Sequence, residues 1–213
     1  MSPLRPINMC HKLDNRFFEE LAKMDPFDVC RRALAEYDAD RKVYRLPALG
    51  MLYEVDAQKR GISPYVKAPG LIIDSPISVE LALAILFYLM KSRDIPISGK
   101  WISEKELQGG VTFFRGPHAF PTPEIARECG KDLETLHRAA KQIGGEPVDM
   151  GDVAYRFRAA PRVPMAVVFW KGDEEFPPEC KLLMDSTIQD HLPLDVIFGL
   201  AIEIARRLTG LPL

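Results

Sequence analysis

The run VELALAILFYLM, residues 79–90, limits the fold more than any other stretch of this sequence. It contains a single charged residue, Glu80, and a helix built from it is apolar around nearly its whole circumference. The run is too short to cross a bilayer, because a membrane-spanning helix needs about 20 apolar residues. We therefore predict a central helix over residues 76–94, ended by Pro96, that other elements cover on several sides.

Two helices are predicted ahead of this central helix, at residues 14–24 and 26–38. Asp25 followed by Pro26 is typical of a helix start, because the aspartate accepts a hydrogen bond from a free backbone N–H and proline fits the first turn. The apolar residues of the second helix that recur at helical spacing, and are expected to face the core, are Phe27, Cys30, Leu34 and Tyr37.

From residue 42 the apolar period changes to two, which is typical of strands. Residues 42–55 alternate apolar and polar side chains on either side of Gly50, which suits a turn. Residues 68–74 have the pattern of a further short strand. We therefore expect strands to separate the N-terminal helices from the central helix.

The second half of the chain is predicted to combine helices with antiparallel strands. A helix over residues 122–145 begins it, and Gly130 can divide that helix into two pieces. Three antiparallel strands and an amphipathic final helix follow. They are expected at residues 153–160, 164–170, 180–185 and 194–210.

This order of elements predicts the fold class. Helices, strands, a helix and strands again follow one another without the regular alternation of a parallel α/β fold. We therefore predict an α+β fold, with a largely antiparallel sheet packed against several helices. No linker or repeat divides the chain, so we expect one α+β domain, residues 41–213, with an N-terminal helical extension, residues 1–40.

Composition and motifs exclude several classes of function. With 28 Lys+Arg against 30 Asp+Glu, the net charge of −2 provides no attraction to nucleic acid or to an anionic membrane. The sequence has no P-loop, GxGxxG, GxSxG, HExxH or paired CxxC motif, so common nucleotide, hydrolase and zinc sites are not expected. Four scattered cysteines and the lack of a signal peptide indicate a cytoplasmic protein with free thiols.

The stretch FFRGPHAFP, residues 113–121, is the first candidate site. A capping box at residues 103–106 predicts a short helix before it, and residues 111–114 are expected to form a strand. The arginine can bind a carboxylate or phosphate, the histidine can transfer a proton or bind a metal, and the phenylalanines can wall a flat ligand. Alternatively, the phenylalanines anchor an irregular loop to the core. The candidate residues are Phe113, Phe114, Arg115, His118 and Phe120.

The acidic loop WKGDEEFPPEC, residues 170–180, is the second candidate. Its carboxylates can bind a hard cation, pair with an arginine or carry a proton at a raised pKa. Alternatively, it is a solvated turn whose acids keep the sheet edge from pairing with another chain. Because Phe176 lies among the acids, we expect part of the loop to turn inward. The candidate residues are Asp173, Glu174 and Glu175.

A third cluster lies in DSTIQDHLPLD, residues 185–195, where three aspartates accompany His191. Its spacing matches no known arrangement of metal ligands. A turn followed by the start of the last helix is the simpler interpretation, so we predict no metal site.

Two arginines in the strand at 153–160 form a separate feature. If Tyr155 and Phe157 face the core, Arg156 and Arg158 share the opposite face of the sheet. There they can meet the acidic loop, or they can receive an anionic ligand. The sequence leaves both alternatives open.

Residues 101–126 and 162–200 resemble an uncharacterised prokaryotic family, a domain of unknown function found mostly in anaerobic bacteria and archaea. The likeness extends over nearly the whole chain after about residue 25. Some members of that family resemble fusions to a four-cysteine iron–sulfur domain of corrinoid and carbon-monoxide metabolism. This chain lacks that cysteine array, so the resemblance implies an anaerobic, redox or cofactor-associated setting and assigns no catalytic residue. Its most specific pieces are residues 109–118, 173–177 and 185–195.

Three functions stay open at this point. The first is a cytosolic accessory module that binds a small-molecule cofactor, such as a corrinoid or other tetrapyrrole, or a redox partner protein. The second is a small enzyme that uses His118 as general acid/base, Arg115 as anion anchor and a glutamate of the acidic loop as second proton carrier in a shared pocket. The third is a protein-interaction domain without a small ligand.

Overall fold

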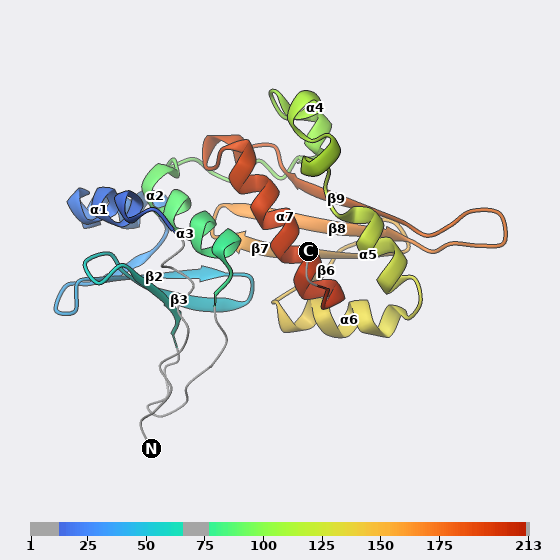
Figure 1. Ribbon diagram of the computed structural model, residues 1–213, viewed down its shortest axis with the longest axis horizontal. Coiled ribbons are helices and arrows are strands. Elements are labelled where there is room, and N and C mark those ends of the chain that lie inside the picture. Colours follow the sequence, from blue (N-terminus) through green and yellow to red (C-terminus); the bar gives the residue numbers. More distant parts are fainter. Residues whose placement is uncertain (1–12, 66–76, 212–213) are drawn as a thin grey trace, which may run out of the picture.

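Two antiparallel sheets share one hydrophobic core in the computed structural model, which describes residues 13–65 and 77–211 (Figure 1). The smaller sheet has the strand order β1-β2-β3-β4, and the larger has the order β5-β9-β8-β7-β6. All described pairings are antiparallel, so the predicted α+β class is confirmed. The smaller sheet consists of β1 (Glu36–Asp38), β2 (Val43–Ala48), β3 (Met51–Asp56) and β4 (Gly61–Pro64). The larger consists of β5 (Trp101–Ile102), β6 (Glu146–Pro147), β7 (Val153–Ala160), β8 (Val163–Trp170) and β9 (Glu179–Asp185).

The predicted strand region at 42–55 is confirmed as the β2–β3 hairpin, whose turn joins the two sheets. Leu49 and Gly50 both have positive φ in this turn, and the Leu49 amide donates to the carbonyl of Arg158 in β7 at 2.8 Å. A Cβ atom on Gly50 would lie 2.6 Å from the backbone carbonyl carbon of Ile143. Only glycine therefore allows this turn to touch the end of the neighbouring helix. The strand predicted at residues 68–74 lies outside the described residues.

The N-terminal helices begin where the sequence predicts. Asp14 caps α1 (Asn15–Lys23), and Asp25 caps α2 (Pro26–Ala33) by accepting a hydrogen bond from the Phe27 amide at 3.1 Å. The predicted end of α2 at residue 38 is wrong, because Leu34 adopts a left-handed conformation at φ 51° and the chain then enters β1.

The predicted core-facing stripe is confirmed for Cys30 and Tyr37, which pack against the core, and is wrong for Phe27 and Leu34. Phe27 and Leu34 are 79% and 54% exposed, whereas Val29 and Ala33 are fully buried. The expected stripe continued through residue 37, which belongs to a strand instead. With the helix shortened to two turns, the small and β-branched residues face the core and the phenylalanine faces solvent.

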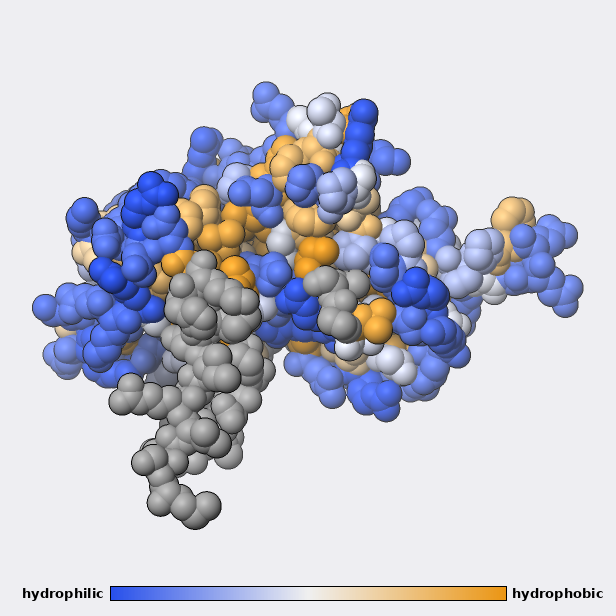
Figure 2. All heavy atoms as spheres, viewed as in Figure 1, coloured by the Kyte–Doolittle hydropathy of each residue, from blue (hydrophilic) through white to orange (hydrophobic). Residues whose placement is uncertain are grey.

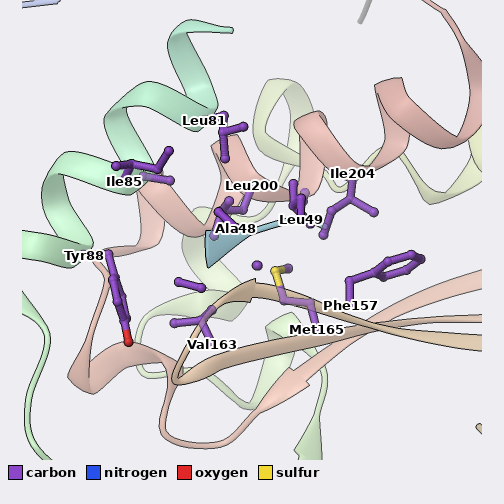
Figure 3. Close-up of a cluster of buried hydrophobic side chains, with 14 of the residues drawn as sticks. Ala48, Leu49, Leu81, Ile85, Tyr88, Phe157, Val163, Met165, Leu200 and Ile204 are labelled. Atoms are coloured by element: carbon purple, nitrogen blue, oxygen red, sulfur yellow. The ribbon is translucent and has the colours of Figure 1, made fainter. Parts of the chain in front are cut away.

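The central helix α3 (Val79–Lys91) is confirmed as a buried element, although it is shorter than predicted and ends at Ser92. It packs against α1 and α2 on one side and against α7 (Leu194–Thr209) on another. Figure 3 shows its inward side chains meeting α7, the end of β2 and the β7–β8 hairpin. The labelled side chains are Leu81, Ile85 and Tyr88 from α3, Leu200 and Ile204 from α7, Ala48 from β2, Leu49 from the β2–β3 turn, and Phe157, Val163 and Met165 from the large sheet.

The second half also follows the prediction. The helix expected at 122–145 is divided at Gly130 into α5 (Thr122–Cys129) and α6 (Leu133–Gln142), which pack with α7 on the large sheet. In β7, Tyr155 and Phe157 are buried and the two arginines are exposed, as the alternation predicts.

Arg162, in the turn between β7 and β8, joins the large sheet to the end of α2 and to the segment that follows α3. Its guanidinium donates to the carbonyls of Arg32 at 2.9 Å and Ile95 at 2.6 Å, and it pairs with Asp94 at 2.5 Å. Since one side chain holds the end of α2 and the segment after α3, Arg162 has a structural role in this fold.

The domain boundary proposed at residue 40 stays a prediction. In the structure, α1 and α2 pack on α3, and β1 pairs with β2 across that position. Among the described helices, none has both the length and the apolar character needed to span a bilayer.

Candidate functional site

In the large sheet, the two-residue strand β5 covers only the end of β9. The partners of these two residues are Met184 and Asp185 of β9. After Ile102 the chain leaves the sheet and forms the short helix η2 (Glu104–Glu106), held by the predicted capping box at Ser103. The remaining part of β9, residues 179–183, therefore has β8 on one side and, within residues 13–65 and 77–211, no strand on the other.

The main chain of this open segment presents hydrogen-bonding groups outward. Opposite Cys180, the carbonyl of Phe169 in β8 accepts a bond from Asp152, on the side of β7. The amide of Ser186, just beyond β9, donates to Lys100 at 2.9 Å, on the side of β5. Because alternate residues of an antiparallel strand face opposite neighbours, the amides and carbonyls of Cys180 and Leu182 face away from β8.

A groove of about 550 Å³ follows this open edge. Residues 103–105, which follow β5, and residues 179–182 of β9 line it. Phe114 and Phe120 supply aromatic wall, and Thr122 and Pro123 at the start of α5 complete it. The groove therefore occupies the place that a longer β5 would take beside β9.

The aromatic wall is fixed by a continuous row of rings that starts on α7. The ring of Phe198 meets His118 edge-on at 5.4 Å, and His118 stacks on Phe113 at 4.8 Å with an angle of 19°. Phe113 contacts Phe114 at 5.0 Å, and Phe114 contacts Phe120 at 4.7 Å. Such ring pairs each contribute about 1 kcal/mol beyond burial, so the row holds the loop in one place.

The aromatic segment has a local structure that differs from the prediction. Residues 111–114, expected as a strand, belong to the short helix α4 (Gly110–Phe113). The helix starts because Gly109 is left-handed at φ 79°, and because Gly110 lies so close to η2 that a Cβ would be 1.9 Å from the Glu104 carbonyl oxygen. Arg115 donates to the carbonyl of Val111 and so closes this helix. Its guanidinium is thus used locally and does not line the groove.

The groove is nearly neutral and offers no reactive thiol. Glu104 and Lys105 line it with opposite charges, and Lys181 pairs with Glu179 at 3.2 Å along the strand. Burial raises the pKa of the Cys180 thiol well above its usual value. The thiol therefore stays protonated at neutral pH and is a poor nucleophile and metal ligand.

The acidic loop lies at a different end of the molecule from the aromatic segment. Figure 1 shows the β8–β9 connection projecting beyond the sheet at one end, whereas α4 lies above β9. Asp173 accepts hydrogen bonds from the amides of Glu175 and Phe176, each at 2.8 Å, and these bonds hold the pKa of its carboxyl below the usual value. Phe176 is 67% exposed, so the expected inward turn of this loop is wrong.

The structure thus separates the residues that the enzyme hypothesis needs together. His118 and Arg115 belong to the aromatic segment, while the side chains of Glu174 and Glu175 make no hydrogen bond or ion pair with any described residue. None of these four residues lines the groove. The arginines of β7 do not reach the acidic loop either, since Arg156 pairs with Glu146 of β6.

The third cluster is structural. Burial alone would raise the pKa of Asp185, but hydrogen bonds from Thr187 and Ser98 outweigh it and keep the pKa below its usual value. His191 is buried and its Nδ1 accepts from the Arg93 amide at 3.3 Å. No group of three or more potential ligand side chains in the described parts of the chain is arranged to hold a metal ion.

Sequence reasoning found the aromatic wall of the groove but missed its other side. The open edge depends on where β5 ends, and the printed sequence contains that signal. The capping box at Ser103 follows Trp101 and Ile102 directly, so a strand there is limited to these two residues. A short strand beside a longer one leaves an edge unpaired.

A protein-family model described as "Domain of unknown function (DUF3786)" matches residues 25–207 of the chain. The match confirms the likeness to a domain of unknown function, and the association with anaerobes and with iron–sulfur domains stays a prediction. Searches of curated proteins and of solved structures found no match.

Proposed function

We propose that this chain, a member of the family described as "Domain of unknown function (DUF3786)", is a partner-binding module. An extended segment of a protein partner lies in the groove beside β9 and adds a strand to the large sheet. This is the partner-binding form of the accessory module that the sequence predicts, and a redox protein is one partner of that kind.

One observation supports the proposal above the others: β5 ends after two residues, and a groove lined by β9 takes the place of its continuation. An unpaired strand edge presents main-chain donors and acceptors in alternation. Another extended strand is the partner that satisfies both kinds of group. Aromatic side chains beside the edge then provide pockets for alternate side chains of the incoming segment.

The dimensions and charges of the groove describe its occupant. Four residues of β9 line it, and a strand that pairs with them covers roughly 13 Å at about 3.3 Å per residue. Lining charges of both signs, Glu104 and Glu179 with Lys105 and Lys181, favour a segment of low net charge. Apolar side chains on one face of that segment would contact Phe114 and Phe120.

A planar cofactor is the other ligand that the sequence suggests for this wall. A corrinoid or other tetrapyrrole would also contact Phe114 and Phe120, but it would not pair with the amides of Cys180 and Leu182. The two forms of the proposal therefore differ in one measurable property, which is whether binding uses the main chain of β9.

Peptide selection tests the proposal. A displayed library of unstructured peptides is selected on the full chain, and the affinities of the selected peptides are measured for two variants. Cys180→Pro removes one outward amide without removing a bond to β8, and Cys180→Ala is the matched control that keeps the amide. We expect peptides with alternating apolar residues, bound about fivefold more weakly by Cys180→Pro, because a lost main-chain bond is worth about 1 kcal/mol.

Three outcomes contradict the proposal. One is a failure to select any peptide, and another is equal binding by both Cys180 variants. The third is a visible chromophore in protein purified without oxygen that is lost in Phe114→Ala, which would favour the cofactor form. If Cys180→Pro does not fold, a charged Ala119→Lys in the groove wall serves as the blocking variant, with Val111→Lys on exposed α4 as its control.

A further inference from the structure

We infer that the chain has a second binding site, independent of the β9 groove: a trough across the face of the large sheet that faces away from the core, which binds a small oxyanion with a flat apolar body. The trough has a volume of about 250 Å³, and every strand of the large sheet contributes to it. One lining residue from each strand, in the order across the sheet, is Trp101, Asp185, Pro164, Arg158 and Glu146.

Arg158 supplies the charge that selects an anion. Its side chain is exposed, and among the described residues its guanidinium makes no hydrogen bond and no ion pair. A guanidinium fork without a partner matches the two oxygens of a carboxylate or phosphate. The neighbouring Arg156 on the same face differs, because it already pairs with Glu146.

The acids in the trough leave the donors of Arg158 unused. Asp185 is 2% exposed, and its two oxygens accept hydrogen bonds from Ser98, Gly99 and Thr187. Glu146 is occupied by Arg156, although it is near enough to Arg158 to interact electrostatically with it. Arg158 is therefore the lining arginine whose whole guanidinium is without a hydrogen-bond or ion-pair partner among the described residues, and both lining carboxylates already accept hydrogen bonds.

The position of Arg158 is fixed by the junction of the two sheets. Its carbonyl accepts the Leu49 amide at 2.8 Å, and a register shift in β7 follows it at residues 158–160. A second cavity of about 360 Å³, formed by the β2–β3 turn and Gly144, shares Glu146 and Arg158 with the trough. An anion bound at Arg158 thus has room on both sides, at a junction between sheets where ligand sites are common.

The rest of the lining is apolar and suits a flat body. Trp101, Pro161 and Pro164 line the trough, and Ile97 at its rim is 45% exposed. Gly99, at φ 76°, has no atom within 4 Å of the place where a Cβ would stand, so the floor beside Trp101 is open. A planar ring can lie against the indole while its oxyanion reaches Arg158.

Protein NMR tests this site because the chain has two tryptophans, which give two indole N–H signals. Trp101 lines the trough, and Trp170 lies under Lys181 at 5.0 Å and serves as the internal control. Trp170→Phe assigns the signals. Benzoate and phenyl phosphate are the probes, benzamide is the uncharged control, and inorganic phosphate is the control without a ring.

We expect both charged ring probes to shift the Trp101 signal in a saturable way and to leave Trp170 unchanged. Arg158→Gln should weaken this binding about tenfold or more, Arg158→Lys less, and Arg138→Gln on the surface of α6 not at all. A stronger response to one charged probe distinguishes a carboxylate ligand from a phosphate ligand.

Two results would overturn the inference. One is the absence of any Trp101 shift at about 10 mM of either charged probe, and the other is an equal shift with benzamide. The test does not use the edge of β9, so its failure leaves the peptide-binding proposal standing. If Arg158→Gln does not fold, Arg158→Lys and the comparison of benzoate with benzamide still decide the question.

Discussion

The aromatic segment at residues 113–120 and the acidic loop at residues 173–176 have similar prominence in the sequence and opposite places in the structure. The first is joined to α7 through a row of ring contacts and forms the wall of a groove. The second projects from the end of the large sheet and makes hydrogen bonds within its own turn (Figure 1). Segments rich in chemically active residues therefore differ most in whether their side chains are held by the rest of the fold.

The surface view gives the same contrast on a larger scale. Figure 2 shows apolar residues gathered over the middle of the molecule, next to the region of α4 and α7, while the outer loops are mostly hydrophilic. Phe114, Leu194 and Phe198 are partly buried apolar residues that pack against the core. The aromatic segment is thus part of the apolar middle of the protein, and the acidic loop is part of its solvated periphery.

The largest expected effect comes from one phenylalanine in each segment. Phe120→Ala should lower the free energy of unfolding by about 3 kcal/mol, because the ring is 8% exposed and its loss leaves a cavity. Phe176→Ala should change it by less than about 0.5 kcal/mol, because that ring is 67% exposed. Urea unfolding of the two variants measures both values. Equal losses would break the comparison between the two segments.

A pH titration of stability extends the comparison to the third cluster. Burial lowers the pKa of His191, with Asp190 and Asp185 opposing that shift and Arg162 and Arg93 adding to it. The unfolded chain then binds the proton first. Stability from the neutral imidazole is complete above pH about 6.5 and decreases as the pH falls below it.

His191→Asn, which keeps a side-chain acceptor for the Arg93 amide, should reduce this decrease. The share of one group is at most about 1.4 kcal/mol per pH unit. Unfolding free energies at pH about 7 and 5 for both proteins provide the test. An unchanged slope in the variant would show that His191 is not the group that opposes folding in acid.

A double-mutant cycle measures how firmly the aromatic row is joined. We expect a coupling energy of about 1 kcal/mol between Phe113 and His118, since their rings stack at 4.8 Å. His118→Ala and Phe113→Leu supply the single changes. A coupling near zero would mean that His118 is free of the row and available for another role.

The smallest effect is predicted for the acidic loop. Asp173→Ala removes the acceptor of two backbone amides, so the amides of Glu175 and Phe176 should exchange with solvent faster. Glu174→Ala should leave their exchange unchanged, because its side chain makes no hydrogen bond in the described structure. Hydrogen exchange resolved by residue tests both. A global loss of protection in Asp173→Ala would assign the loop a structural role beyond its own turn.

Much of the fold follows from local signals in the sequence. The caps at Asp14 and Asp25, the division of a helix at Gly130 and the alternation in β7 each act within a few residues, and each was predictable for that reason. The end of α2 was not predictable in this way. Its last turn competes with the pairing of β1 to β2, in which Tyr37 lies opposite Tyr44. The helical spacing of apolar residues carries no sign of that competing strand pairing.

The candidate site was half predictable for the same reason. The aromatic residues are visible in the sequence, but their conversion from an expected strand to α4 depends on the approach of Gly110 to η2. The groove itself depends on the pairing of β5 with β9, which lie about 80 residues apart in the chain. The capping box at Ser103 marks where β5 ends, but it does not show which strand β5 pairs with, and that long-range pairing decides which edge stays open.

The central claim, that an extended peptide adds a strand at β9, is tested most directly by hydrogen exchange of single amides. Residue-resolved exchange is measured on the full chain, with and without a selected peptide. Protection of the Cys180 and Leu182 amides, with little change at Lys181, would agree with the account, because only the first two face the open edge. Peptide binding that leaves the Cys180 and Leu182 amides exchanging as before would contradict it.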